Sequence, residues 1–290
     1  VSNLVNMHSG YNGLQSGLAV VADTYYHALS ALSLITKVYD NRGHDNVTND
    51  SIKAEAFATL RNPADPSYNE SEMIGDPAGT MGASTTIVES EYYAPYLDHA
   101  CMEPMNCTVS VTADRGDVWG GHQNPPSALG VAAEEFGMEQ ENVFQHTTFL
   151  GGGFGRRIRN DDVRQAAAIG KAIMRPVKVV WSREETTVQA KTRPYSTYYF
   201  KGGLDANGKP HALQTRVVSH SIFNHQIPQF MTNGLDRVAL ENIDARSPYV
   251  WPNKSVHYAM RNNHLPVHWW RGVGAPKNQF AVEGHVDELA

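Results

Sequence analysis

Residues 151–157 read Gly151-Gly152-Gly153-Phe154-Gly155-Arg156-Arg157, and the rest of the chain is arranged around them. The residues before it, 143–150, are rich in β-branched and aromatic side chains and predict a strand. The residues after it, from Asp161 to 174, carry an alanine-rich pattern that predicts a helix. A glycine-rich turn between a strand and a helix start directs several backbone N–H groups at one point, which is typical of an anion site.

The composition of this loop favours a ligand. Four glycines in five positions let the backbone approach a ligand without clashes from Cβ atoms. The guanidinium groups of Arg156, Arg157 and Arg159 add fixed positive charge that suits a phosphate. Phe154 is expected to be buried, which suggests a ring held against a flat ligand. A plain β–α turn with solvated arginines explains the loop equally well when it is taken alone.

Two common nucleotide-binding patterns do not fit the loop. The dinucleotide fingerprint that begins at Gly151 requires a glycine at position 156, where this chain has Arg156. No Gly-Lys-Ser/Thr follows the glycines, so the loop is not a phosphate-binding Walker loop. The class of ligand therefore has to be inferred from the rest of the chain.

Length and composition describe an ordinary globular protein. The chain has 290 residues, of which 41% are hydrophobic and 19% charged, enough for one large domain or two smaller ones. A net charge of −6 and a pI of about 6.1 argue against binding to nucleic acid. No run reaches the roughly 18 apolar residues of a transmembrane helix. The chain starts at Val1 without a signal-peptide pattern, so we expect a processed chain or a piece of a longer one.

The two cysteines, Cys101 and Cys107, are too few to form a zinc or iron–sulfur site by themselves. Nothing in the sequence requires a disulfide between them. Buried free thiols are therefore the preferred interpretation.

The first 84 residues predict a small β–α–β piece. A short apolar run at 18–22 predicts a buried strand, Asp23-Thr24 a helix start, and 37–40 a returning strand. Residues 51–60 predict a second helix. The proline- and glycine-rich residues 61–84 predict a linker, which places a domain boundary near residue 85.

The remaining residues predict a mixed α+β domain. Its expected elements are a strand at 85–93, a hairpin at 108–121, a helix from Pro125 to Gly137, a strand at 177–181, a hairpin at 196–219 around Asn207-Gly208, and a helix at 278–290. Residues 220–255 carry only a weak pattern. The predicted fold class is α+β, with a small α/β piece over 1–84 followed by a larger domain over 85–290.

Three segments together resemble one family. They are Leu97-Asp98-His99-Ala100-Cys101-Met102-Glu103-Pro104, the loop at 151–157, and Trp270-Arg271-Gly272-Val273-Gly274 followed by Glu283 and Asp287-Glu288-Leu289-Ala290. Their order and spacing resemble the molybdenum hydroxylases, the xanthine dehydrogenase and aldehyde oxidase family. The Gly-Arg-Arg ending of the loop is similar to the isoquinoline 1-oxidoreductase β-subunit branch, which includes bacterial aldehyde dehydrogenases. The resemblance covers roughly residues 18–290.

The resemblance implies a fold, a cofactor and a site. The fold would be part of an α/β hammerhead-type domain over 1–84 and the first half of a molybdopterin-binding domain over 85–290. The cofactor would be molybdenum bound to molybdopterin, in its cytosine dinucleotide form, with no direct metal ligand from this chain. Gln123 would face an oxo or sulfido group of the metal, and Arg271 would present its backbone to it. The residues implied to lie against the metal and pterin are Gly152, Gly153, Phe154, Gly155 and Arg156.

Departures from the family pattern limit what the resemblance implies. The substrate-binding Glu of the xanthine branch is replaced by Ile158, so purine binding is not implied. The family's general-base Glu, in a Gly-Glu motif, has no counterpart and is expected outside this chain. The chain also lacks the cysteine patterns of 2Fe–2S domains, so electrons are expected to pass to a 2Fe–2S partner subunit. In this branch they often continue to a cytochrome c subunit, and the location is periplasmic or membrane-associated through partners.

The predicted function is that of a molybdopterin-dependent oxidoreductase subunit, which oxidises or hydroxylates an aldehyde or N-heterocycle with water as the oxygen source. A non-catalytic or truncated relative without metal, and a nucleotide-binding protein, remain alternatives. Taken singly, Gln123, Phe154 and Arg271 also fit ordinary roles in a loop, a core and a cation–π contact. Glu103 is expected to be structural. The histidines are expected to be mostly ordinary polar or surface residues: His99, His122, His146, His220 and His225.

Overall fold

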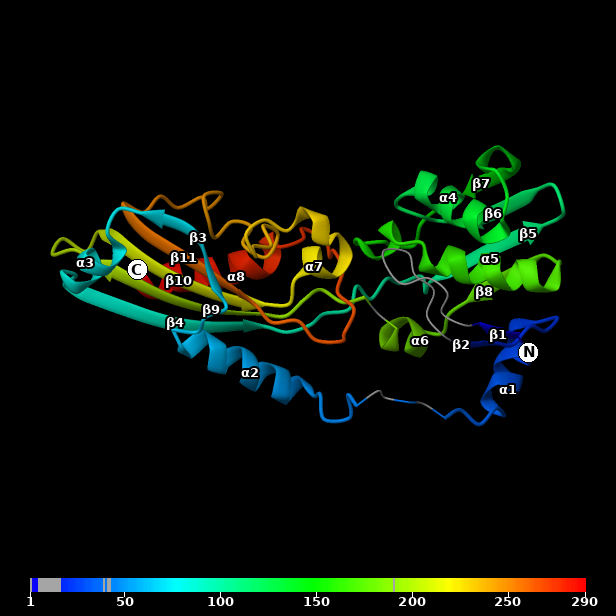
Figure 1. Cartoon of the computed structure of the whole chain (residues 1–290), viewed down its shortest axis with the longest axis horizontal. Helices are drawn as coiled ribbons and strands as arrows, with labels where there is room; N and C mark the ends of the chain where they lie inside the picture. Colours follow the sequence, from blue (N-terminus) through cyan, green and yellow to red (C-terminus); the bar gives the residue numbers. More distant parts are fainter. Residues whose placement is uncertain (1, 5–16, 39, 41–42, 190) are drawn as a thin grey trace. The chain divides into compact units, whose positions relative to one another are not determined.

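The chain forms two compact units in a computed structural model that describes residues 2–4, 17–38, 40, 43–189 and 191–290. The first unit comprises Val1–Asp40 and Asp98–Ala190, and the second comprises Asn41–Leu97 and Lys191–Ala290. Both units combine helices with sheets (Figure 1), so the predicted α+β class is confirmed. The division near residue 84 into a hammerhead-like and a molybdopterin-binding domain stays a prediction.

The first unit is built on a four-stranded sheet with the order β7-β6-β5-β8. Its strands are β5 (Asn106–Val111), β6 (Gly116–Gly120), β7 (Val143–Thr147) and β8 (Val177–Val180). Strands β6 and β7 are parallel, and the other pairs are antiparallel. Helices α4 (Pro125–Phe136) and α5 (Asp161–Ile173) cover one face (Figure 1). On this face, alternate residues of β5 are buried in one hydrophobic cluster with residues of both helices. The predicted strand, loop and helix around residue 151 are thereby confirmed.

The other elements of the first unit are short. Strands β1 (Ser2–Leu4) and β2 (Gly17–Ala19) are antiparallel, and α1 (Tyr25–Ser33) begins at Thr24, as predicted, where the Thr24 hydroxyl accepts the His27 N–H. The predicted strand at 37–40 is wrong: residues 37, 38 and 40 are not in a strand, and Tyr39 lies outside the described residues. Two 3₁₀ turns, η1 (Gln140–Asn142) and η2 (Arg156–Ile158), and helix α6 (Arg183–Val188) complete the unit.

The second unit is built on a five-stranded sheet with the order β3-β11-β10-β9-β4. Its strands are β3 (Tyr68–Ile74), β4 (Thr86–Ala94), β9 (Ser196–Leu204), β10 (Pro210–Ser219) and β11 (Asn253–Met260). Only β10 and β11 are parallel within this sheet. Helix α8 (Ala275–Leu289) and helix α2 (Asn49–Arg61) both pack on it (Figure 1). The hairpin at Asn207-Gly208 and both of these helices were correctly predicted.

Two hydrophobic clusters hold the sheet of the second unit between its helices. Phe200 and Val217 belong to the same buried cluster as Ala281 of α8. Ala56 of α2 belongs to a second cluster with Val218, the neighbour of Val217 on β10. Because adjacent strand residues point to opposite faces, α8 and α2 cover opposite faces of the sheet. The unit also contains α3 (Pro77–Gly82), α7 (Ile222–Gln226) and the 3₁₀ turn η3 (Pro228–Phe230).

The predicted linker at 61–84 is wrong, because this segment contains β3 and α3. Strand β3 is an edge strand with mostly polar side chains, so it lacks the apolar alternation of a half-buried strand. It is fixed by an ion pair of 2.8 Å between Glu72 and the buried Lys254 of β11. Helix α3 begins with Pro77, and the side chain of Asp76 accepts the Gly79 N–H at 2.9 Å.

Both cysteines are buried free thiols, as the sequence favoured. Burial raises the pKa of each thiol above its ordinary value. Within the described part of the chain, every helix is too short or too polar to pass through a bilayer.

Candidate functional site

The glycine loop connects the edge strand β7 to α5 and has an unusual backbone. Gly152 and Gly155 have φ values of 98° and 101°, and Phe154 has a φ of 52°. A bulky residue in this left-handed region is strained, and such strain persists only where the surroundings hold it in place. Phe154 was expected to be buried, but 39% of it is exposed. The loop therefore presents an aromatic side chain outward from a constrained backbone.

Gln123 holds the second half of the loop. Its side-chain oxygen Oε1 accepts the backbone N–H of Gly155 at 2.9 Å and that of Arg157 at 3.3 Å. The backbone N–H of Gln123 donates to the backbone carbonyl of Arg157 at 2.9 Å. Only the oxygen of an amide accepts N–H donors, so these contacts fix which end of the amide faces the loop. The side-chain NH₂ group is thereby directed away from the loop on an exposed residue.

Gly153 must be glycine for this arrangement to exist. A Cβ atom at this position would lie 2.4 Å from Oε1 of Gln123 and 2.6 Å from its Cδ. These separations are far below van der Waals contact. A side chain here would displace the Gln123 amide from the loop. The contact of Gln123 with the loop therefore depends on the glycine at position 153.

Glu103 holds the first half of the loop. Its carboxylate Oε2 accepts the Gly151 N–H at 2.8 Å, while the Glu103 N–H donates to the Gly151 carbonyl at 3.1 Å. Asn106 donates to the other carboxylate oxygen at 2.9 Å. Burial alone would raise the pKa of Glu103, but hydrogen bonds from Asn106 and Gly151 and the charge of Arg157 hold this pKa below its ordinary value. The expected structural role of Glu103 thus becomes specific, since it anchors the loop.

The arginines of the loop are directed into the protein. The Arg156 guanidinium is 1% exposed and forms two hydrogen bonds to the Asp161 carboxylate, at 2.8 and 2.9 Å. Arg157 is fully buried and donates to the carbonyl oxygens of Gly152, Glu103 and Pro104 at 2.8–3.1 Å. These contacts favour a role in shaping the loop over direct contact of either guanidinium with a phosphate. Binding of the cofactor by Arg156 stays a prediction.

His122, which the sequence grouped with the ordinary polar or surface histidines, is buried. It precedes Gln123, is 6% exposed, and neither ring nitrogen has a hydrogen-bond partner among the described residues. Burial, and then the charge of Arg157, lower the pKa of His122 to about 4, so the ring is neutral at pH 7. His99 and His220 are also buried, so of their two expected roles, ordinary polar or surface residue, the surface one is wrong. No periodicity marked these positions.

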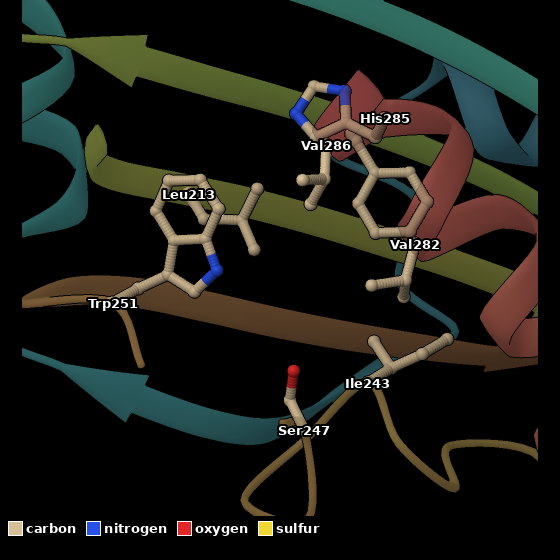
Figure 2. A pocket seen from close by; sticks show the side chains of 8 residues that line it. Leu213, Ile243, Ser247, Trp251, Val282, His285 and Val286 are labelled. Carbon is tan, nitrogen blue, oxygen red and sulfur yellow. The ribbon is translucent and has the colours of Figure 1, made fainter. Parts of the chain in front are cut away.

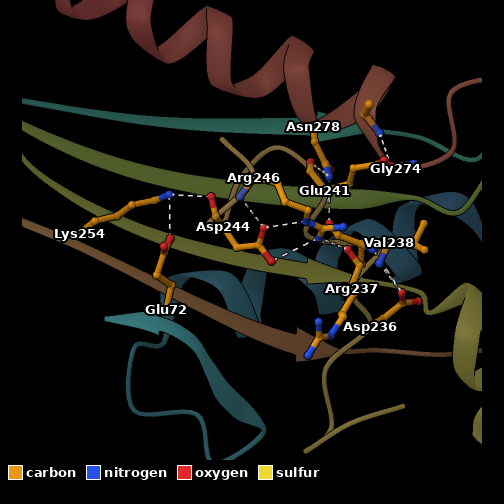
Figure 3. Close-up of polar contacts among 12 residues, drawn as sticks. Glu72, Asp236, Arg237, Val238, Glu241, Asp244, Arg246, Lys254, Gly274 and Asn278 are labelled. Carbon is orange, nitrogen blue, oxygen red and sulfur yellow. Dashed lines mark hydrogen bonds and ion pairs between the residues drawn. The ribbon is translucent and has the colours of Figure 1, made fainter. Parts of the chain in front are cut away.

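Arg271 belongs to the second unit, whereas the loop residues belong to the first. It is exposed, in a turn where Gly272 and Val273 both have positive φ. The turn is held by Glu241, whose carboxylate accepts the N–H groups of Gly274 and Ala275 at 3.0 and 3.2 Å. Figure 3 shows the Glu241 contact with Gly274 beside Asn278, which donates to the Glu241 carbonyl at 2.7 Å. The Arg-Gly segment is therefore a rigid turn at the start of α8.

A small cavity in the second unit is a separate feature. It lies between α8 and the sheet and is lined by Trp251, Ser247 and His285, among others (Figure 2). None of the predicted site residues lines it. The cavity is therefore not part of the candidate site.

Comparison with known proteins identifies the family. The family model described as the molybdopterin cofactor-binding domain matches residues 62–290. The chain is 29% identical over 203 residues to the isoquinoline 1-oxidoreductase subunit beta of Brevundimonas diminuta, which covers 69% of this chain and 26% of that protein. It is 26% identical over 275 residues to the aldehyde oxidoreductase molybdenum-binding subunit PaoC of Escherichia coli O157:H7, which covers 93% of this chain and 35% of that protein.

Solved structures show the same fold. The quinoline 2-oxidoreductase of Pseudomonas putida 86 aligns with a TM-score of 0.62 and 18% identity over 77% of this chain and 28% of that one. The aldehyde oxidoreductase of Desulfovibrio gigas aligns with a TM-score of 0.60 and 17% identity over 81% of this chain and 27% of that one. The chain thus spans about a quarter to a third of the length of these relatives. It belongs to the molybdenum hydroxylase family and carries that family's molybdopterin cofactor-binding domain.

Proposed function

We propose that this chain is part of the molybdenum subunit of an oxidoreductase that oxidises an aldehyde or hydroxylates an N-heterocycle, with water as the oxygen source. Membership of the family supports the oxidoreductase class. The observation that carries the proposal is the fixed amide of Gln123, whose oxygen is held by Gly155 and Arg157. An NH₂ donor held in this way suits a group with exposed acceptor oxygens or sulfurs, and a molybdenum cofactor is such a group.

The residues of the first unit fit the cofactor through their donors and their shape. The residues proposed to hold it are Gln123, Gly152, Gly153, Phe154, Gly155 and Arg156. When bound, molybdenum supplies the two-electron redox chemistry and the activation of water. The protein's part is to place the Gln123 donor and the outward Phe154 ring on a loop that does not need to rearrange. Arg271 of the second unit is proposed to contribute its rigid turn.

The remaining parts of the reaction are proposed to lie elsewhere. We propose that a general-base Glu outside these 290 residues takes the proton, and that electrons leave to a 2Fe–2S partner subunit and then to a cytochrome c subunit. The cofactor form is proposed to be the cytosine dinucleotide, and the location periplasmic or membrane-associated through partners. Ile158, at the position of the family's purine-binding Glu, favours an aldehyde or a simple N-heterocycle as substrate.

The source of the oxygen atom tests this function. The enzyme, purified with its partner subunits from a host that makes the cofactor, is incubated with isoquinoline in ¹⁸O-labelled water and an artificial electron acceptor. We expect ¹⁸O in the hydroxylated product by mass spectrometry, and no label when ¹⁸O₂ is supplied in ordinary water. Label from ¹⁸O₂ would contradict water as the oxygen source. A molybdenum-loaded enzyme that turns over neither isoquinoline nor aldehydes would contradict the proposal and favour a non-catalytic relative.

A further inference from the structure

The second unit contains an arginine without a carboxylate partner. Arg193 is half-buried, and its Nη2 donates to the Pro95 carbonyl at 2.7 Å. Its Nε is buried and has no acceptor among the described residues. Burial lowers the pKa of Arg193. The Tyr198 hydroxyl acts in the opposite direction, and no carboxylate contributes to this pKa. Buried charges in proteins are normally paired, so this guanidinium lacks an anion.

One further donor without an acceptor lies beside it. The Arg193 guanidinium carbon is 5.8 Å from the ring centroid of Trp270, whose indole Nε1 is buried without a hydrogen-bond partner in the described structure. A guanidinium and an indole N–H are both groups that donate to oxygen. The cluster therefore has donors and lacks the acceptor.

The backbone around these donors is rigid. Arg193 exchanges two backbone hydrogen bonds with Leu97, at 2.8 and 3.3 Å. Thr192 donates to the Pro266 carbonyl at 3.1 Å and accepts from the His268 N–H at 2.8 Å. The segments that carry Arg193 and Trp270 are thus tied together, and the donors are placed before any ligand arrives.

Lys277 adds positive charge nearby. It is 2% exposed, and its ammonium donates to the Ser196 hydroxyl at 2.8 Å. Burial is the main cause that lowers the pKa of Lys277, Asp236 and Glu241 act to raise it, the charge of Arg193 acts to lower it, and together they bring it to about 7. Both carboxylates are already engaged, Asp236 by Ser221 at 2.7 Å and Glu241 by the α8 N-terminus. An added anion would therefore be attracted by both cations.

We propose that Arg193 and Trp270 form a binding site for an oxyanion, a carboxylate or a phosphate group, of a small-molecule ligand. The inference rests on the proposed function to the extent that Trp270 directly precedes Arg271. A phosphate would come from the cofactor, and a carboxylate from a substrate or product. The shared chemistry is an oxyanion that accepts charge-assisted hydrogen bonds from a guanidinium and a neutral one from an indole.

The Trp270 indole N–H reports on this site directly. The ¹⁵N-labelled chain is titrated with sodium phosphate and, separately, with sodium formate, at constant ionic strength, and the indole signals are assigned with Trp270→Phe. We expect a saturable shift of the Trp270 signal. Arg193→Gln should weaken the binding about tenfold or more, because hydrogen bonds to charged groups contribute at least one factor of ten. Tighter binding of phosphate would indicate the cofactor as the source, and tighter binding of formate a carboxylate ligand.

Arg61→Gln is the matched control. Arg61 belongs to the same unit and also lies over an aromatic ring, 5.0 Å from that of Phe57, but it has a carboxylate partner, Glu91, at 2.7 Å. This variant should bind both anions like the wild type. If Arg193→Gln does not fold, as judged by circular dichroism, calorimetric titration of Trp270→Phe replaces it and should show weakened binding.

A Trp270 signal that neither anion moves, a shift that never saturates, or equal binding by Arg193→Gln and the wild type would overturn the inference. The proposed function has a separate readout, the molybdenum content of the longer enzyme. If the chain binds the anion but the longer enzyme contains no molybdenum, the proposed function is contradicted and the anion site is supported. If the longer enzyme contains molybdenum but no anion binds at Trp270, the anion site is contradicted and the proposed function is supported.

Discussion

The side-chain oxygen of Gln123 lies 2.9 Å from the backbone nitrogen of Gly155, across 32 residues of sequence, and this contact determines what the loop presents. The same oxygen accepts the Arg157 N–H, so the amide is oriented by the loop and the loop is shaped by the amide. A donor whose direction is fixed before a ligand binds loses little freedom on binding. The contact thus joins the architecture of the first unit to the proposed chemistry.

Two substitutions separate the two functions of Gln123. Gln123→Glu keeps an acceptor for Gly155 and Arg157 but removes the NH₂ donor, so we expect near-normal stability and a loss of cofactor or activity. Gln123→Ala removes the acceptor as well and should lower the free energy of unfolding by about 1–3 kcal/mol, because two buried N–H groups lose their partner. Urea denaturation and molybdenum analysis measure the two effects. Equal stability of the wild type and Gln123→Ala would show that the contact does not hold the loop.

Glu103→Gln is expected to weaken the other end of the loop. The substitution removes the charge that pairs with Arg157 at 3.4 Å and brings an amide NH₂ towards a donor, either Asn106 or the Gly151 N–H. The free energy of unfolding should fall by about 1–3 kcal/mol. Glu139→Gln, at an exposed position of the same unit, is the control and should stay within about 0.5 kcal/mol of the wild type. A fall of the same size in both variants would rule out a specific anchor.

Gly153→Ala is expected to destabilise the first unit by about 1–3 kcal/mol, because its Cβ would meet the Gln123 amide. Gly130→Ala in α4 is the matched control, since its Cβ would have no neighbour closer than 3.6 Å. An alanine in a helix is favoured over glycine, so the control should be neutral or more stable. Thermal unfolding of both proteins measures the difference. If Gly153→Ala unfolds like Gly130→Ala, the close packing of Gly153 on Gln123 is refuted.

The pH dependence of stability should contain a contribution from Asp162, which is buried at the start of α5. Burial, and then the charge of Asp161, raise the pKa of Asp162 to about 7. The unfolded chain releases this proton near pH 4, at the ordinary pKa of about 3.9. The stability that comes from the protonated folded form is therefore complete below about pH 4 and is lost as the pH rises through about 7.

Asp162→Asn removes this titration, so it should lose less stability than the wild type between about pH 5 and about pH 8. Chemical denaturation at the two pH values measures this difference. An identical loss in both proteins would show that Asp162 ionises normally in the folded state.

Local patterns made much of the fold predictable. Strand β7, the glycine loop and α5 follow from residue types that act over short distances, and Thr24 was correctly identified as a helix start. Strand β3 was missed because an edge strand tolerates polar side chains on both faces. Strand β11 was missed because it lies between two other strands, where burial on both faces removes the alternation.

The sequence proposes candidate site residues but does not contain their contacts. Gln123 and the loop glycines were selected through the resemblance, but the anchoring by Glu103 depends on residues 48 positions apart in the sequence. Arg156 was expected to face a phosphate, whereas its side chain pairs with Asp161. Whether a charged side chain points inward depends on the partner it finds after folding, and neither spacing nor composition contains this information.

Molybdenum content shows whether this protein binds the cofactor through Gln123. The chain, and a longer form that includes any natural downstream sequence, are produced in a host that makes the cofactor and are analysed by inductively coupled plasma mass spectrometry. We expect near-stoichiometric molybdenum in the longer form and a clear loss of the metal in its Gln123→Ala variant. No molybdenum in either wild-type form, from a host whose other molybdenum enzymes are loaded, would contradict this expectation.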